Sequence, residues 1–208
     1  ASTASAITYI DGDAGILLYR GYPIEQLAKH STFLEVSYLL QHGELPNKAE
    51  FVAFTRSITR HTMLNEWLLR FYRSFHHNAH PMAMLATIVA SLAAFYHDST
   101  NINDDRHREI FSHRMIAKIP TIAAASYKHA LGQPFIYPRN DLDYCANVLN
   151  MLFSVPCEPY NVDPLHAKAL DLLLSGSLRR YGDISGRETA MLLNLAYRVS
   201  ADVALARS

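Results

Sequence analysis

Pro81-Met82-Ala83-Met84-Leu85-Ala86-Thr87-Ile88-Val89-Ala90-Ser91-Leu92-Ala93-Ala94-Phe95-Tyr96 is the stretch that decides the fold class of this chain. A proline at its start and apolar residues throughout predict a buried helix. The apolar run of about fifteen residues is shorter than the roughly 20 that a bilayer-spanning helix needs. The alanines allow close approach of another backbone. We therefore expect this helix to be packed on all sides, and a symmetry mate could supply part of that packing.

The sequence around this stretch also has helical spacing, from Pro23 to about Leu174. Two β-rich runs, Ile7–Ile10 and Ile16–Tyr19, flank a Gly/Asp turn and predict a hairpin. Pro120 should kink or break the helix that contains it. The sequence thus predicts a mainly α fold with a small N-terminal β-hairpin. The helices are expected at about 23–28, 33–40, 48–63, 65–75, 81–96, 106–131, 142–153 and 164–174.

Composition limits the classes of function. The 208 residues are 50% apolar and 18% charged, with a formal net charge of zero, which is typical of a globular protein. Without a basic excess we expect no nucleic-acid partner, and no segment predicts a membrane partner. The first residues lack the pattern of an export signal. With two cysteines, Cys145 and Cys157, the expectation is a cytoplasmic protein with reduced thiols.

The composition changes after Leu174. Ser175-Gly176-Ser177 is typical of a linker, and residues 188–207 predict an amphipathic helix. We therefore divide the chain into an N-terminal segment with the hairpin (1–22), a helical body (23–174) and a tail (175–208).

Several cationic and aromatic residues are candidates for a ligand site. Arg60-His61-Thr62-Met63, Tyr96, Arg114 and Lys118 combine charge-assisted donors with an aromatic face, as phosphate-bearing ligands require. Arg114 and Lys118 share a helix face at i,i+4. From the residues alone, a solvated helix face and a cationic helix end are the alternatives. No glycine-rich dinucleotide fingerprint is present, and we expect no metal site.

Ordered blocks of sequence resemble one enzyme family over residues 7–174. The chain is similar to the front part of citrate synthase, in particular the hexameric, NADH-sensitive type of Gram-negative bacteria. The blocks are Ile10-Asp11-Gly12-Asp13-Ala14-Gly15-Ile16-Leu17, Tyr19-Arg20-Gly21-Tyr22-Pro23-Ile24, Arg60-His61-Thr62-Met63, His80-Pro81-Met82-Ala83, Tyr96-His97-Asp98, Arg106-His107-Arg108-Glu109, Gly132-Gln133-Pro134-Phe135, Tyr137-Pro138-Arg139-Asn140-Asp141-Leu142 and Phe153-Ser154-Val155-Pro156-Cys157-Glu158-Pro159-Tyr160.

The resemblance implies the multi-helical citrate synthase fold and an acyl transfer. The complete enzyme condenses acetyl-CoA with oxaloacetate and water to citrate and CoA, the entry step of the tricarboxylic acid cycle, with no further cofactor. The family places its catalytic histidines, aspartate and arginines after the helix that ends here near Leu174, and the sequence from Ser175 departs from the family. We therefore carry over no catalytic residue and expect a truncated or rearranged chain that lacks the catalytic half.

The resemblance also implies an allosteric site for NADH, an inhibitor of the hexameric type, and self-association as a dimer or hexamer. An alternative function is a non-catalytic nucleotide-binding or oligomerisation module, and a generic helical scaffold is a third. The residues that match the family's NADH site are Arg60, His61, Thr62, Met63, Tyr96, Arg114, Lys118, Asn140 and Cys157.

Overall fold

The computed structural model describes residues 7–11 and 13–177, which form mostly helices and a small antiparallel sheet. The mainly α prediction is confirmed. The strands are β1 (Thr8–Asp11), β2 (Ile16–Tyr19) and β3 (Tyr22–Pro23). The α-helices are α1 (Ile24–His30), α2 (Phe33–His42), α3 (Lys48–Arg60), α4 (Glu66–Phe71), α5 (Pro81–Ser91), α6 (Asp105–Ala130), α7 (Tyr144–Phe153) and α8 (Pro164–Ser177), and the 3-10 turns are η1 (Tyr72–Ser74), η2 (Leu92–Ala94) and η3 (His97–Ser99).

The described residues fall into two compact units. One contains residues 7–56 and 164–177, and the other contains residues 57–163, so that the boundary lies inside α3. The predicted amphipathic helix at 188–207 lies outside the described residues.

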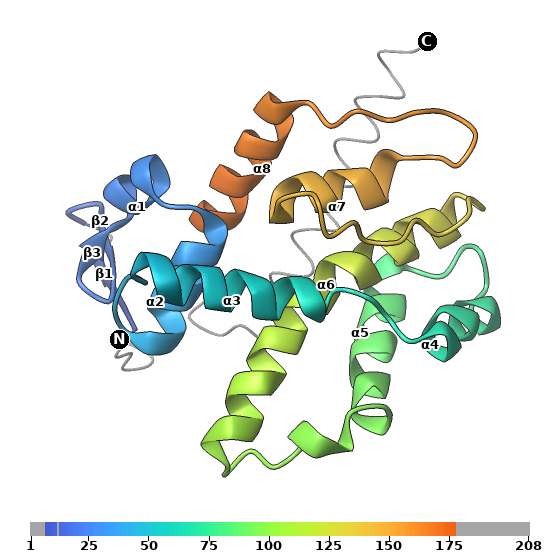
Figure 1. Ribbon diagram of the computed structural model, residues 1–208, viewed down its shortest axis with the longest axis horizontal. Helices are drawn as coiled ribbons and strands as arrows, with labels where there is room; N and C mark the ends of the chain where they lie inside the picture. The colour runs from blue at the N-terminus through green and yellow to red at the C-terminus, as the bar shows by residue number, and fades with distance from the viewer. Residues whose placement is uncertain (1–6, 12, 178–208) are drawn as a thin grey trace. The chain divides into compact units, whose positions relative to one another are not determined.

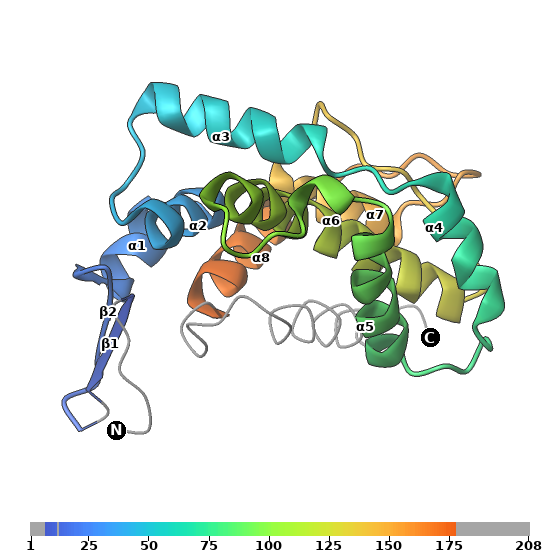
Figure 2. The same ribbon diagram turned by 90° about the horizontal axis from the view of Figure 1, so that it is seen from below.

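In the first unit the sheet has the order β1-β2-β3. The predicted hairpin is present, with Thr8 opposite Tyr19 and Asp11 opposite Ile16. Gly15 in the connecting turn has φ 67°, a conformation that glycine adopts without strain. The short strand β3 was not predicted. It adds a third strand immediately before α1, labelled in Figure 1, and Figure 2 shows the paired strands β1 and β2 beside each other.

The helices of the first unit have clear sequence signals at their ends. Thr32 and Glu35 form a capping box at the start of α2, and Gly43 ends that helix with φ 92°. Helix α8 contacts α1 and α2, and Asp171 accepts a hydrogen bond from Phe33 N at 3.0 Å. The predicted linker at Ser175–Ser177 is wrong, because α8 continues through it and Ser175 is buried.

Helix α6 is the centre of the second unit. It contacts α5 and α7 and lies between them in Figure 1. Its first ten residues are exposed or half-buried apart from His113, whereas every residue from Met115 to Ser126 is buried. Such continuous burial requires neighbours around the whole circumference, so this segment is the core of the unit.

The predicted kink or break at Pro120 is not a break, because α6 is continuous through that residue. Proline has no N–H, so Ile116 O lacks its usual i+4 donor. The Tyr144 hydroxyl on α7 donates to Ile116 O at 2.9 Å and replaces that donor. A tertiary contact that the sequence pattern does not reveal therefore satisfies the backbone next to the proline.

Tyr72 links η1 to α6. Its hydroxyl donates to Ile122 O at 2.9 Å and lies 3.1 Å from Ser126 Oγ, and its burial raises its pKa well above the ordinary value. Helical spacing puts Trp67 and Phe71 on the apolar face of α4, yet Trp67 is 66% exposed and Phe71 is 38% exposed.

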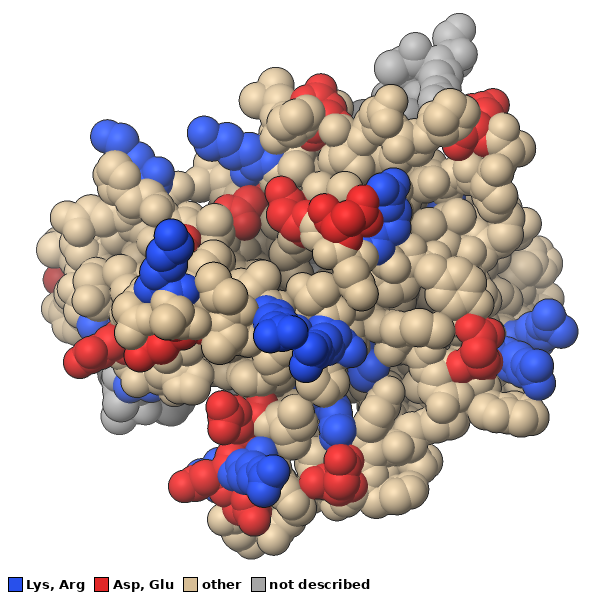
Figure 3. Space-filling view, viewed as in Figure 1, with Lys and Arg blue, Asp and Glu red and all other residues tan. Residues whose placement is uncertain are grey.

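Within the described residues the apolar helix α5 is packed on one side only, and packing of its other side by a symmetry mate stays a prediction. Met84, Leu85 and Ile88 of α5 are buried, but Ala83, Ala86, Thr87 and Ala90 are exposed. In the described part of the chain, no helix combines the length and the hydrophobicity that crossing a bilayer requires. On the face in Figure 3, acidic and basic side chains lie scattered among uncharged residues.

Candidate functional site

The second unit contains a cavity of about 250 Å³. Residues in η2 and η3, in the loop between η3 and α6, and in the first half of α6 surround it. The lining combines apolar side chains with a group of polar and charged ones. The lining residues are Leu92, Ala93, Tyr96, Ser99, Thr100, Asn101, Ile102, His107, Arg108, Phe111, Arg114, Met115 and Lys118.

Arg114 is the main cation of the cavity, and its side chain is only 13% exposed. Its Nη1 and Nη2 donate to Asp98 Oδ1 and Oδ2 at 2.8 and 3.0 Å, and Nη1 also donates to Ser99 Oγ at 2.7 Å. The guanidinium carbon lies 4.6 Å from the centroid of the Tyr96 ring. The guanidinium is therefore fixed by a bidentate ion pair and by an aromatic ring.

Lys118 follows Arg114 by one helical turn and is 2% exposed. Its Nζ donates to His61 O at 2.8 Å and to Met63 O at 2.6 Å, and it lies 5.0 Å from the centroid of the Tyr96 ring. Burial, followed by the nearby Arg114 charge, lowers the Lys118 pKa to about 8. Lys118 thus attaches the segment after α3 to α6, and it also adds positive potential to the cavity.

The Tyr96 ring is shared by both cations. Burial raises the pKa of its phenol, Arg114 opposes that effect and Asp98 adds to it, so the phenol is neutral near pH 7. The backbone oxygen of Tyr96 accepts a hydrogen bond from Ser99 Oγ at 3.1 Å. The Tyr96 backbone is therefore attached to η3, and two cations lie against its ring.

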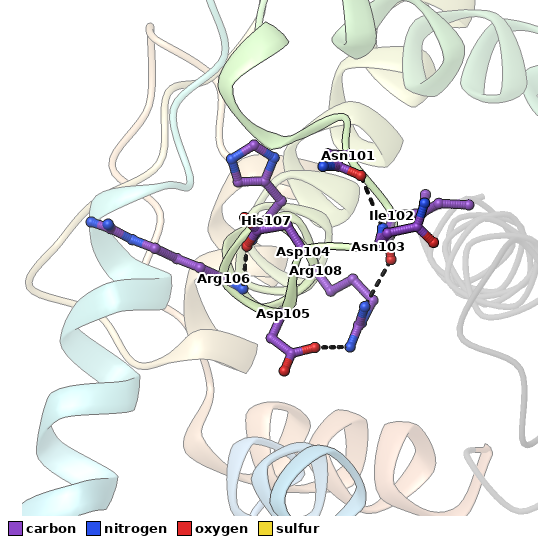
Figure 4. A network of polar contacts seen from close by, with 8 residues as sticks. All are labelled: Asn101, Ile102, Asn103, Asp104, Asp105, Arg106, His107 and Arg108. Atoms are coloured by element: carbon purple, nitrogen blue, oxygen red, sulfur yellow. Dashed lines mark hydrogen bonds and ion pairs between the residues drawn. The ribbon is translucent and has the colours of Figure 1, made fainter.

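The rim of the cavity is ordered by polar contacts at the start of α6, shown in Figure 4. Asp104 caps the helix and accepts from the backbone N–H groups of Arg106 and His107. Arg108 pairs with Asp105 and donates to Ile102 O at 2.8 Å. These contacts attach the loop before α6 to the first turn of the helix, so the rim is positioned by secondary structure.

Two polar atoms at the cavity have no hydrogen-bond partner among the described residues. They are Arg114 Nε and His107 Nδ1, and both are buried. A buried polar atom without a partner loses the free energy of its bond with water. Both atoms are shielded from solvent as well, so a ligand in the cavity reaches them only if neighbouring side chains shift.

The nine residues predicted from the sequence are only partly brought together. Tyr96, Arg114 and Lys118 line the cavity. His61 and Met63 contact Lys118 through their backbone oxygens. The remaining four are not lining residues: Arg60, Asn140 and Cys157 are exposed, and the Thr62 oxygens bond with Thr59 O and Thr121 Oγ1.

No sequence pattern marks Asp98 and Ser99 as partners of Arg114, or Ile102 and Phe111 as parts of the apolar wall. The ion pair joins residues sixteen positions apart in separate elements. A pattern based on helical spacing gives no signal for such a pair, because the pairing depends on how the loop folds back over α6.

Comparison with known proteins gives the family. Residues 1–176 match the family model described as citrate synthase, C-terminal domain. The chain belongs to the citrate synthase family. A crystal structure of citrate synthase from Pyrobaculum aerophilum matches with a TM-score of 0.73 and 33% identity, over 84% of this chain and 44% of that chain.

Two further citrate synthase structures match. That from Thermotoga maritima MSB8 has a TM-score of 0.65 and 30% identity, covering 83% of this chain and 42% of that chain. The Thermoplasma acidophilum enzyme, in a ternary complex with carboxymethyl coenzyme A and oxaloacetate, has a TM-score of 0.76 over 91% of this chain and 53% of that chain, and its 20% identity supports the fold alone. The chain spans about half the length of these citrate synthases.

Proposed function

We propose that this chain supplies the helical framework of a citrate synthase, which condenses acetyl-CoA with oxaloacetate and water to give citrate and CoA. The family match over residues 1–176 supports this proposal. We also propose that the 208 residues alone are catalytically incomplete. The catalytic motifs that the resemblance associates with later positions do not occur in them, and without a positioned base and carboxylate-binding arginines the barrier stays high.

An assay of CoA release from acetyl-CoA and oxaloacetate tests this proposal with the purified 208-residue chain. We expect no thiol release above the rate without protein. Turnover at an ordinary enzymatic rate, on the order of 1–10³ per second, would refute the incompleteness.

We further propose that the cavity is a regulatory nucleotide site of the NADH-sensitive, hexameric type. The observation that carries this proposal is the joining of Tyr96, Arg114 and Lys118 around one cavity. An aromatic ring beside two cations suits a ligand with a flat base and a phosphate. The His61–Met63 segment would act indirectly, because its backbone oxygens accept hydrogen bonds from Lys118 and so hold that cation in place.

The size of the cavity limits how much ligand it encloses. Its volume of about 250 Å³ is below the roughly 300–1,000 Å³ of sites that bury a drug-sized molecule. We therefore propose that one nucleoside end of NADH enters the cavity that Phe111 and Tyr96 help to line, and that the pyrophosphate lies beside Arg114. Arg60, Asn140 and Cys157 would then contact only parts of the ligand outside the cavity.

Isothermal titration calorimetry with NADH tests the site. We expect saturable binding by the wild-type chain and at least a tenfold loss in Arg114→Leu, because a charge-assisted contact to phosphate is worth about 1.5–3 kcal/mol. Arg70→Leu is the matched control: Arg70 also lies over an aromatic ring, 4.7 Å from the centroid of Trp67, but does not line the cavity. Equal losses in both variants, or no binding by the wild type, would contradict the proposal.

Self-association and a cytoplasmic location complete the proposed function. The exposed Ala83, Ala86 and Ala90 on α5 support self-association, since small side chains allow another helix to approach closely. Sedimentation velocity of the wild type and of Ala86→Glu tests this part. A dimer or larger oligomer that the charge disrupts is expected, and a wild-type monomer at all concentrations would refute it.

A further inference from the structure

Asp98 forms an ion pair with Arg114, the residue beside which we place the ligand's phosphate. Both carboxylate oxygens of Asp98 accept from the end of the Arg114 guanidinium, at 2.8 and 3.0 Å. Two opposite charges in this arrangement cancel most of the attraction that Arg114 offers to a second anion. An incoming phosphate must therefore displace the carboxylate or bind beside it against like-charge repulsion.

The two partners of this ion pair differ in their access to water. The Arg114 side chain is 13% exposed, whereas the Asp98 side chain is 69% exposed. Asp98 belongs to the short turn η3, and its mostly exposed carboxylate can exchange its contact with Arg114 for contacts with water. Arg114 is held by Tyr96 and Ser99 as well, so it stays in place when the carboxylate leaves.

Arg114 has more donors than Asp98 uses. Its Nε is buried without a partner among residues 7–11 and 13–177, and the same holds for His107 Nδ1 at the same cavity. The His107 charge also lowers the pKa of Asp98, after the larger effect of the Arg114 hydrogen bond. The pyrophosphate of NADH carries two negative charges and more oxygens than the Asp98 carboxylate, so it can pair more strongly with the Arg114 guanidinium and the nearby His107 charge.

From this geometry we propose that Asp98 is an internal competitor that pairs with Arg114 in the empty cavity and is displaced by the phosphate of the nucleotide. The inference rests on the proposed nucleotide site and adds a specificity rule to it. Displacing Asp98 costs a phosphate-bearing ligand free energy, which the stronger pairing of its phosphates with Arg114 and the nearby His107 charge offsets. A monocarboxylate only replaces one carboxylate with another and has no net advantage.

Calorimetric titrations of the wild-type chain and Asp98→Asn with NADH and with adenosine test this inference. Without the competing charge, Asp98→Asn should bind NADH about fivefold more tightly, the upper range for an ion pair with one exposed partner. The affinity for adenosine, which has no phosphate, should change less than about twofold, because no anion competes for Arg114. Asp98→Ser removes the same charge and should likewise bind NADH more tightly than the wild type, with little change in its affinity for adenosine.

Asp141→Asn is the matched control. Asp141 also forms an exposed ion pair, with Arg139, and removing it changes the net charge equally, but it does not line the cavity. Its NADH affinity should equal that of the wild type. If the wild type binds NADH and Asp98→Asn binds it equally or more weakly, Asp98 is not a competitor although the nucleotide site stands. If neither chain binds NADH, both proposals are overturned.

Discussion

Replacing Tyr144 with phenylalanine should destabilise the protein through a carbonyl that a proline has left without its helical donor. The Tyr144 hydroxyl donates to Ile116 O at 2.9 Å, four residues before Pro120 in α6. Ile116 itself is 8% exposed, so water cannot readily replace the hydroxyl. A buried carbonyl without a partner costs about 1–3 kcal/mol, and we expect a loss of about 2 kcal/mol in the free energy of unfolding.

Urea denaturation of four chains isolates this effect: wild type, Tyr144→Phe, Pro120→Ala and the double variant. The Pro120→Ala substitution restores an N–H that can donate to Ile116 O. Tyr144→Phe should therefore lower stability by about 2 kcal/mol in the wild-type background and by less than about 0.5 kcal/mol in the Pro120→Ala background. Tyr137→Phe is the control, because the Tyr137 hydroxyl bonds with the exposed Glu66. Equal losses in both backgrounds would refute the reasoning.

Three further predictions concern stability. The Lys118 pKa of about 8 lies below its ordinary 10.5, so between these pH values the unfolded chain holds a proton that the folded chain has lost. In urea titrations, the free energy of unfolding of the wild type relative to Lys118→Met should therefore rise by up to about 3 kcal/mol from pH 7 to pH 10.5. A difference that does not change with pH would contradict the burial effect. Thr32→Ala should lower the free energy of unfolding by about 1 kcal/mol, because the capping box with Glu35 is lost, and no change in the urea midpoint would contradict this role. Leu39→Ala, at a fully buried position in α2, should lower it by about 2–5 kcal/mol, and a thermal melt that stays at the wild-type midpoint would contradict the assignment of this leucine to the core.

The fold was predictable where the sequence carries local signals. Proline at the start of α5, the Gly43 stop after α2 and the Gly/Asp turn of the hairpin each place an element boundary correctly. These signals are local because they act on a few neighbouring dihedral angles. The linker predicted at Ser175–Ser177 also came from a local signal, because small residues weaken a helix. Tertiary packing overrides that signal, since the buried face of α8 continues through Ser175.

Burial was less predictable than helix position. Helical spacing groups Trp67 and Phe71 with Leu68 and Tyr72 on one apolar face, yet only Leu68 and Tyr72 are buried. Helical spacing identifies a face, but the width of that face depends on how closely the next element approaches. Helix α5 shows the same limit, because its alanines are apolar in sequence and yet several of them remain exposed in the described chain.

The candidate site separates what spacing can and cannot reveal. Arg114 and Lys118 are one turn apart on α6, and the structure places both beside Tyr96, as a shared helix face suggests. Their partners nevertheless differ in kind: a flexible carboxylate holds Arg114, and fixed backbone oxygens hold Lys118. Sequence reasoning treated the two cations as equivalent phosphate ligands. Only Arg114 can exchange its partner without breaking the chain path after α3, so the anion-dependent part of ligand binding should depend on Arg114, and Lys118 should act mainly on stability.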